Sequence, residues 1–277
     1  MLEPLVSVIL PIYNEEGFIS KTLDSLLNQT YRHYEVVVID DGSTDRTGEI
    51  LAEYSKSNER IKVLSKKHKP PSVITTSRSC KARRMGIEHC EGEWVLNYSA
   101  HVLAERNLVS ALVETLNGLN DPDVVAVGCG DDTYCEGSVT TEILYKLWSL
   151  GRKFPDKSCY VKNVCYAIFR KDVIEKLGGF PDGCDCELNT LLNRAGYRKY
   201  FTSRTKVHYC PTMMGVKNFF KHNLVYGNGR QQHLVKYPDS SDFRKYLLLS
   251  MLTFPLGYGV GFFLGLLGVD VRRSMGL

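Results

Sequence analysis

The sequence has little net charge for its length. Its 277 residues carry 35 Lys and Arg against 31 Asp and Glu, a formal balance of +4. So small an excess argues against nucleic-acid binding as the default function. Two local basic clusters, residues 66–69 and the pair Arg83 and Arg84, are compatible with phosphate contacts or with a solvated basic surface, and both alternatives stay open.

The sequence also lacks paired CxxC spacings and a signal-peptide pattern before its first predicted strand. Its nine cysteines are an odd, scattered set, so we expect reduced thiols in a cytosolic protein rather than disulfides. Cys184 and Cys186 form a single C-x-C, which is weak evidence for a metal without two further ligands. A disordered chain is not expected, because 43% of the residues are hydrophobic and suffice for a large core.

A short β-branched run is the strongest structural signal. Residues 36–39 read VVVI and are followed by Asp40, Asp41 and Gly42. Such a run predicts a strand buried on both faces of a parallel sheet. Two carboxylates at the carboxyl end of such a strand lie where open α/β sheets bind ligands, although a solvated turn with one Asp as a cap is the plainer alternative.

Strand and helix signals alternate along most of the chain. We expect strands at residues 5–10, 61–64, 94–98, 124–127, 164–169, 197–201 and 206–209. Between them, helices are expected over residues 19–27 with Asn14 as a cap, 50–54 with Ser43 or Thr44 as a cap, 80–90, 108–116, 143–150, 173–177, 185–195 and 216–226. This order predicts an α/β fold with a mostly parallel mixed sheet flanked by helices.

Residues 246–269 contain no charged side chain, and basic residues flank them on both sides. The run is long enough to cross a bilayer as a helix, but Pro255 and several glycines interrupt it. We expect membrane insertion, with a buried helical hairpin as the alternative. The predicted organisation is therefore one domain over residues 1–235 and a hydrophobic segment over residues 236–277.

Five motifs together resemble one enzyme family. They are PIYNEE (11–16), VVVIDDGSTD (36–45), ARRMGIEHCEGEW (82–94), GGFPDGCDCELNTLLNRAGY (178–197) and YGNGR (226–230). Their order is similar to that of family 2 glycosyltransferases, and VKNVCYAIFRK (161–171) most resembles the succinoglycan-biosynthesis ExoA-like branch. The resemblance implies a GT-A fold, inversion, and a nucleotide-diphosphate sugar as donor.

The resemblance also assigns candidate donor-binding residues. Pro11, Tyr13 and Asp41 match residues that line the nucleotide pocket, Glu15 belongs to the same motif, and Asp40 would stiffen the turn. Asp41 would accept from the uracil or guanine edge. Arg83 matches an arginine that approaches the diphosphate, but Arg84 stands where the family usually has Asn.

The family's metal motif falls on Ser99, Ala100 and His101, where Ser99 replaces the first carboxylate. The resemblance implies a divalent cation, with Mn²⁺ better suited than Mg²⁺ to a site that depends on His101. His208 resembles a later metal-binding histidine. A structural role is the alternative for each histidine.

Asp185 matches the family's general base, which removes a proton from the acceptor hydroxyl during attack. Helix capping is the alternative for this residue. Cys184 replaces the usual preceding Glu, while Glu187 and Asn189 match the pattern. Tyr226 and Arg230 lie in YGNGR, where the family places a basic residue near the diphosphate.

The resemblance implies a membrane-associated enzyme, with its catalytic domain in the cytoplasm, that acts on a lipid-linked or polysaccharide acceptor. A catalytically weakened relative is the second hypothesis, because Arg84, Ser99 and Cys184 depart from the pattern. An α/β nucleotidyltransferase is a third, disfavoured by the absence of a phosphate-cradling Gly-rich loop.

Overall fold

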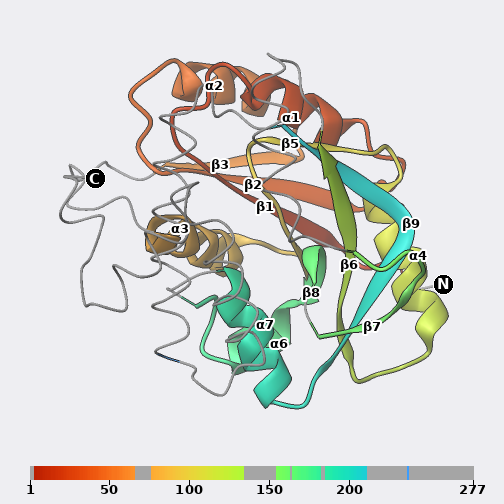
Figure 1. The fold of residues 1–277 in the computed structure, drawn as a ribbon. Coiled ribbons are helices and arrows are strands. Elements are labelled where there is room, and N and C mark those ends of the chain that lie inside the picture. Colours follow the sequence, from red (N-terminus) through yellow and green to blue (C-terminus); the bar gives the residue numbers. More distant parts are fainter. Residues whose placement is uncertain are drawn as a thin grey trace, which may run out of the picture.

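The computed structural model describes residues 3–65, 76–133, 154–162, 164–181, 185–210 and 236. A mixed sheet lies at the centre, with helices on both faces (Figure 1). Its strands follow the order β3-β2-β1-β4-β8-β6-β9-β5, and β7 pairs with β9. They are β1 Val6–Ile12, β2 Tyr34–Asp40, β3 Ile61–Ser65, β4 Trp94–Asn97, β5 Val102–Ala104, β6 Val124–Thr133, β7 Cys159–Val161, β8 Cys165–Arg170 and β9 Arg198–Tyr209.

The predicted buried strand over residues 36–39 is confirmed as the middle of β2. It runs parallel to β1 on one side and to β3 on the other. Its side chains alternate between two cores, with Val36 and Val38 facing one and Val37 and Ile39 the other. A continuous apolar run is required because both faces of this strand are covered.

Two groups of helices cover the sheet. The first consists of α1 Ile19–Leu27, α2 Thr47–Ser57 and α4 Leu108–Leu119, and the second of α3 Thr76–His89, α6 Lys171–Lys176 and α7 Asp185–Arg194. Apolar residues of each group belong to a separate core cluster. The two groups lie on opposite faces (Figure 1), so the fold is a three-layer α/β/α arrangement.

Gly86 brings α3 unusually close to the sheet. A Cβ atom at this position would lie 2.6 Å from Ile39 Cδ1 and 2.8 Å from Ile9 Cγ2. Because a side chain would collide there, glycine fixes the approach of α3 to β1 and β2. The arginines that α3 carries are thereby held near the strand ends.

Several predicted boundaries were wrong. The first strand was predicted to end at residue 10, before Pro11, but β1 continues through Pro11 to Ile12. The pairing of β1 with β4 ends at Ile9 and Asn97, so the missing N–H of proline lies beyond that ladder. The two strands predicted over residues 197–209 form the single strand β9, and β5 and β7 were missed because each has only three residues.

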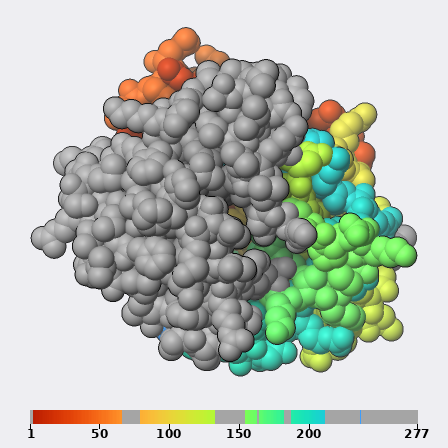
Figure 2. Space-filling model, viewed as in Figure 1, coloured from red at the N-terminus to blue at the C-terminus, as the bar shows by residue number. Residues whose placement is uncertain are grey.

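In Figure 2, the segments that carry β7 and β9 form part of the visible surface.

The predicted helix caps were also wrong. α1 follows Phe18 and α2 follows Arg46, and neither N-cap residue makes a side-chain capping hydrogen bond. Asn14 instead bonds to Ser43 and to Thr44, which joins the loops after β1 and β2. These side chains, which the local sequence would assign to helix caps, form hydrogen bonds between the two loops instead.

Some predictions lie outside the described residues: the helices at 143–150 and 216–226, the basic cluster 66–69 and the hydrophobic segment 246–269. Within the described ranges, no helix is long and apolar enough to span a bilayer. The division at residue 235 therefore stays a prediction.

Candidate active site

Three parallel strands end at one edge of the sheet. Ile12 of β1 pairs with Asp40 of β2, and Ile9 of β1 pairs with Asn97 of β4. The segments that follow carry part of the predicted donor-binding and metal-binding set, namely Tyr13, Glu15, Asp41, Ser99, Ala100 and His101. This edge is the place where open α/β sheets bind ligands.

The loops after β1 and β2 are fastened to each other. Asn14, with a left-handed φ of 55°, accepts from the Thr44 N–H at 2.8 Å and donates its own N–H to Ser43 Oγ at 3.0 Å. The N–H of Glu15 donates to Thr47 Oγ1 at 2.7 Å. These cross-loop bonds fix the backbone that presents Tyr13 and Glu15, where Tyr13 is 36% exposed.

Asp40 is buried and faces its own turn. Its Oδ1 accepts from the Ser43 N–H at 2.9 Å and from the Ser43 hydroxyl at 2.7 Å. The N–H of Asp41 donates to Ile12 O at 3.0 Å, which joins the end of β2 to the end of β1. Asp40 thus shapes the turn, and Asp41 is the half-buried carboxylate that the turn presents.

The end of β4 and the segment that follows it, Ser99–Ala100–His101, are held by side chains from α1 and α3. On one side, Thr22 of α1 donates to Ala100 O at 2.5 Å. On the other, the buried guanidinium of Arg83 donates to Ser79 Oγ, to Asn97 Oδ1 and, at 3.4 Å, to Tyr98 O. The contacts of Arg83 fix the end of β4, and a direct contact with a diphosphate stays a prediction.

His101 lies against Glu15 from the loop after β1. Its Nε2 is 3.1 Å from Glu15 Oε1, and its ring meets Phe18 edge-on with centroids 6.5 Å apart. The other ring nitrogen, Nδ1, is buried and forms no hydrogen bond with the described residues. Two predicted site residues, Glu15 and His101, are therefore brought into contact.

His208 has other partners. Its Nδ1 lies 2.5 Å from Asp132 Oδ1 on β6, and its Nε2 lies 3.9 Å from Glu105 Oε1. Partial burial opposes ionisation of Asp132, but hydrogen bonds from Lys206 and His208 prevail and lower the pKa of this carboxyl group. The ring thus lies between two carboxylates, and a metal-binding role for His208 stays a prediction.

The described residues do not form a closed metal site. They contain no group of three His, Cys, Asp or Glu side chains that could hold an ion. Glu15 and His101 supply two candidate ligands, and Ser99 adds only a weak neutral oxygen. A role for Mn²⁺ or Mg²⁺ stays a prediction.

The helix α7 begins at Asp185, whose side chain lies outside the described residues. Asn189 fixes this helix to the residue just before β8, since its amide accepts from the Val164 N–H and donates to Val164 O, both at 3.1 Å. Glu187 is buried and forms an ion pair with Lys236. Tyr226 and Arg230 lie outside the described residues.

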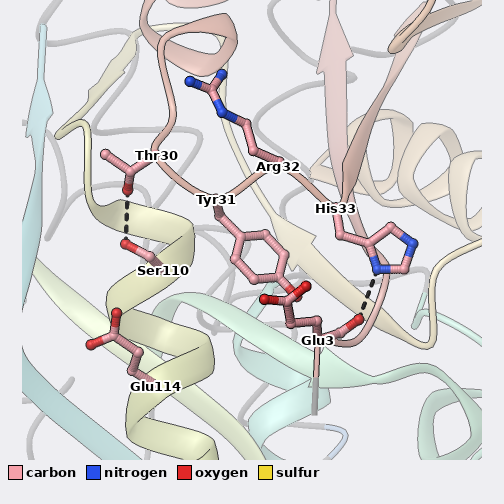
Figure 3. Close-up of a pocket in the computed structure, with 7 residues that line it drawn as sticks. All are labelled: Glu3, Thr30, Tyr31, Arg32, His33, Ser110 and Glu114. Atoms are coloured by element: carbon pink, nitrogen blue, oxygen red, sulfur yellow. Dashed lines mark hydrogen bonds between the residues drawn. The ribbon is translucent and has the colours of Figure 1, made fainter. Parts of the chain in front are cut away.

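An open hollow of about 820 Å³ lies elsewhere. Its lining residues are Glu3, Thr30, Tyr31, Arg32, His33, Ser110 and Glu114 (Figure 3). Glu3 and His33 come just before β1 and β2, so this hollow is at the amino ends of strands whose carboxyl ends carry the candidate site. It contains none of the predicted site residues.

Several residues that shape the site were not predicted. Asn14 and Thr47 join two loops, Thr22 holds Ala100, and Asn97 binds Arg83. Their partners are between 14 and 78 positions away in the sequence. The one available signal was the Asn after Pro11–Ile12–Tyr13, because Asn tolerates the left-handed conformation.

The family model described as "Glycosyl transferase family 2" matches residues 7–178, more than half of the chain. This chain belongs to that family. The match includes the ends of β1, β2 and β4 and the two arginines of α3, and it ends before α7 and Asp185.

Among relatives of this family 2 chain, the glycosyltransferase GlyG of Streptococcus pneumoniae is 30% identical over 124 residues, covering 45% of this chain and 38% of GlyG. A dolichyl N-acetyl-alpha-D-glucosaminyl phosphate 3-beta-D-2,3-diacetamido-2,3-dideoxy-beta-D-glucuronosyltransferase of Methanococcus voltae is 26% identical, covering 80% of this chain and 71% of that enzyme. The mannosyltransferase PcManGT of Pyrobaculum calidifontis, solved with GDP-Man and Mn²⁺, is similar in fold, with a TM-score of 0.64 and 20% identity over 99% of this chain and 76% of that one. The chain thus spans well under half the length of GlyG.

Proposed function

We propose that this chain transfers a sugar, with inversion, from a nucleotide-diphosphate sugar to a lipid-linked or polysaccharide acceptor. The observation that carries the proposal is the convergence of the β1, β2 and β4 ends, with Asp41 and His101, inside a family 2 domain. The proposal includes a catalytic domain over residues 1–235 in the cytoplasm, a membrane-associated segment over residues 236–277 and a place in the ExoA-like branch.

The names of similar proteins support a donor and an acceptor of this kind. The Methanococcus voltae enzyme is named for a dolichyl phosphate-linked sugar, and PcManGT was solved with GDP-Man. We therefore expect a nucleoside diphosphate sugar to occupy the edge where Asp41 and Ser99 lie. The carboxylate of Asp41 would accept hydrogen bonds from the base.

The reaction requires two separate roles, a general base for the acceptor hydroxyl and groups that stabilise the leaving diphosphate. Asp185, at the start of α7, would take the acceptor proton as the hydroxyl attacks the anomeric carbon. The leaving diphosphate needs cationic groups or strong donors, for which Arg83 and Arg230 are the proposed residues. No step is assigned to a metal ion, because the described residues do not form a closed site for one.

Binding of donor tests the proposal directly. Purified protein should show a higher melting temperature with one or more members of a panel of UDP-sugars, GDP-sugars and nucleoside diphosphates, measured with and without Mn²⁺. Absence of stabilisation across the whole panel would remove the basis for the proposed function.

The substitution Asp41→Ala should weaken nucleotide binding by roughly 10- to 100-fold, since hydrogen bonds to a charged group contribute about 1.5–3 kcal/mol. Calorimetric titration with the best nucleotide from the panel measures the change. Asp123→Ala is the control, because Asp123 is an exposed acid just before β6. Equal affinity in Asp41→Ala and wild type would leave Asp41 as a turn residue only.

A second substitution tests the metal prediction. Ser99→Asp adds a carboxylate beside His101 and should tighten Mn²⁺ binding roughly 10-fold in the presence of nucleoside diphosphate, because ligand charge sets affinity for such ions. His101→Ala should abolish the response to Mn²⁺. Ser99→Asn separates the effect of charge from that of shape.

The opposite result has a definite meaning. If arginines alone neutralise the diphosphate, Ser99→Asp places an unpaired carboxylate near phosphate and weakens nucleotide binding, while a chelator leaves transfer unchanged. The direction of the Ser99→Asp effect therefore decides between cation and arginine.

A further inference from the structure

Two consecutive arginines of α3 bind two different segments of the chain. Arg83 binds the end of β4 through Asn97 and Tyr98. Arg84 reaches 96 positions along the chain to Phe180, where its Nε and Nη2 donate to the backbone carbonyl at 3.0 Å and 2.8 Å. Because both lie on one helix fixed to the sheet by Gly86, the two contacts share a rigid support.

Phe180 is held at its ring as well as at its carbonyl. The ring is 1% exposed and belongs to the core beneath α3, α6 and α7. The Arg83 guanidinium carbon lies 5.9 Å from the ring centroid, within the range of a cation–π contact. Arg83 thus contacts the ring of Phe180, while Arg84 binds its backbone carbonyl.

The turn before Phe180 places the Phe180 carbonyl within hydrogen-bond distance of Arg84. Gly178 and Gly179 have φ values of +90° and +89°, a backbone conformation that residues other than glycine rarely adopt. Their N–H groups donate to Glu175 O at 3.0 Å and to Ile174 O at 2.9 Å, which ends α6. The chain then passes Phe180 and reaches the start of α7, at Asp185, five positions later.

We propose that Arg84 is a positioning residue that sets where α7 begins relative to the donor side of the site, so that Asp185 is aligned with the acceptor hydroxyl. This inference rests on the proposed transferase function. The planar guanidinium is required because a fork of two N–H groups on one carbonyl fixes both distance and direction, which the single ammonium of Lys does not. Asn189 holds the middle of α7 to Val164, and Arg84 holds Phe180, five positions before the first residue of α7.

Kinetics and hydrogen exchange of Arg84→Met test the proposal. A displacement of about 1 Å at a reacting group lowers rates by about 10²-fold, so kcat should fall 10- to 100-fold while nucleotide affinity stays within about threefold of wild type. Backbone amides over residues 178–190 should exchange faster. Arg84→Lys should fall between Met and wild type in both measurements.

The matched control is Arg204→Met, which removes an arginine whose Nη2 pairs with Glu114 on an exposed surface. It should leave kcat and exchange over residues 178–190 unchanged. Unaltered kcat and exchange in Arg84→Met would overturn the inference, as would a loss of nucleotide affinity equal to the loss in kcat/KM. Absence of transfer by the wild type with every donor that binds would overturn the transferase proposal, whereas faster exchange in Arg84→Met would still support the grip of Arg84 on this segment.

Discussion

Asp185→Asn is expected to lower kcat by about 10²- to 10⁴-fold, the range over which positioned general bases act. The acceptor hydroxyl must lose a proton as it attacks, and an amide cannot accept it. The proposed donor-binding edge lies at the ends of β1, β2 and β4, on other parts of the chain. Nucleotide affinity in Asp185→Asn should therefore stay within about threefold of wild type.

The measurement needs both halves of the reaction. Single-turnover transfer gives the chemical step, and nucleotide titration of the same preparation gives binding. Asp185→Glu keeps the carboxylate but moves it, so it should retain more activity than Asp185→Asn. If Asp185 only caps α7, Asp185→Asn should transfer almost as well as wild type, since Asn is an equally good cap.

Inversion can be read from the same assay. Transfer by a single displacement gives a product whose anomeric configuration is opposite to that of the donor sugar. Proton spectroscopy of the product, taken early and before any exchange, distinguishes this result from retention.

The strands β1, β2 and β3 were predictable because their sequences carry an unambiguous local signal. Residues 36–39 must lie between two packed helix layers, and only a continuous apolar run satisfies that position. The chain order of β1, α1, β2, α2 and β3 follows from such runs and from helical spacing. The position of Asp40 and Asp41 at a strand end follows in turn.

The middle of the chain was harder to predict because the lengths of its strands depend on pairing with neighbouring strands and not on local sequence alone. β9 continues through Ser203 and Arg204, although both are polar and exposed. It pairs with β6 across two irregularities in register, near Val124 and near Gly128. A ladder with such shifts breaks the alternation of polar and apolar residues on which strand prediction depends.

The contacts that shape the site were the least predictable part. The bonds of Asn14 to Thr44, of Thr22 to Ala100 and of Arg84 to Phe180 join positions 30, 78 and 96 residues apart. Each of these side chains has a local alternative, such as a cap or a solvated surface position. Only the completed fold selects between them.

Lys199→Met is expected to raise the free energy of unfolding at pH 7 by about 2–3 kcal/mol, the largest stability change we predict. Lys199 lies on β9, is 1% exposed and donates to Asn193 Oδ1 at the end of α7. Burial lowers the pKa of its ammonium group to about 8. Met has a similar length and no charge to desolvate, and the exposed Asn193 can bond to water instead.

The same shift predicts how stability depends on pH. Below about pH 8, Lys199 is charged in both the folded and the unfolded chain, and the full penalty of burying the charge is present. Between about pH 8 and 10.4 the unfolded chain binds more protons, so wild-type stability should rise with pH relative to that of Lys199→Met. The difference between the two proteins should vanish near pH 10.4.

Urea unfolding of both proteins at pH 7, 8, 9 and 10 measures this difference, with other titrating groups common to the pair. Lys206→Met is the matched control on the same strand, because Lys206 is exposed and its pKa is raised by a hydrogen bond and charge pairing with Asp132. Its loss should change stability by less than about 1 kcal/mol. A constant difference between Lys199→Met and wild type from pH 7 to 10 would show that the Lys199 ammonium group is solvated in the folded protein, in conflict with its burial beneath α7.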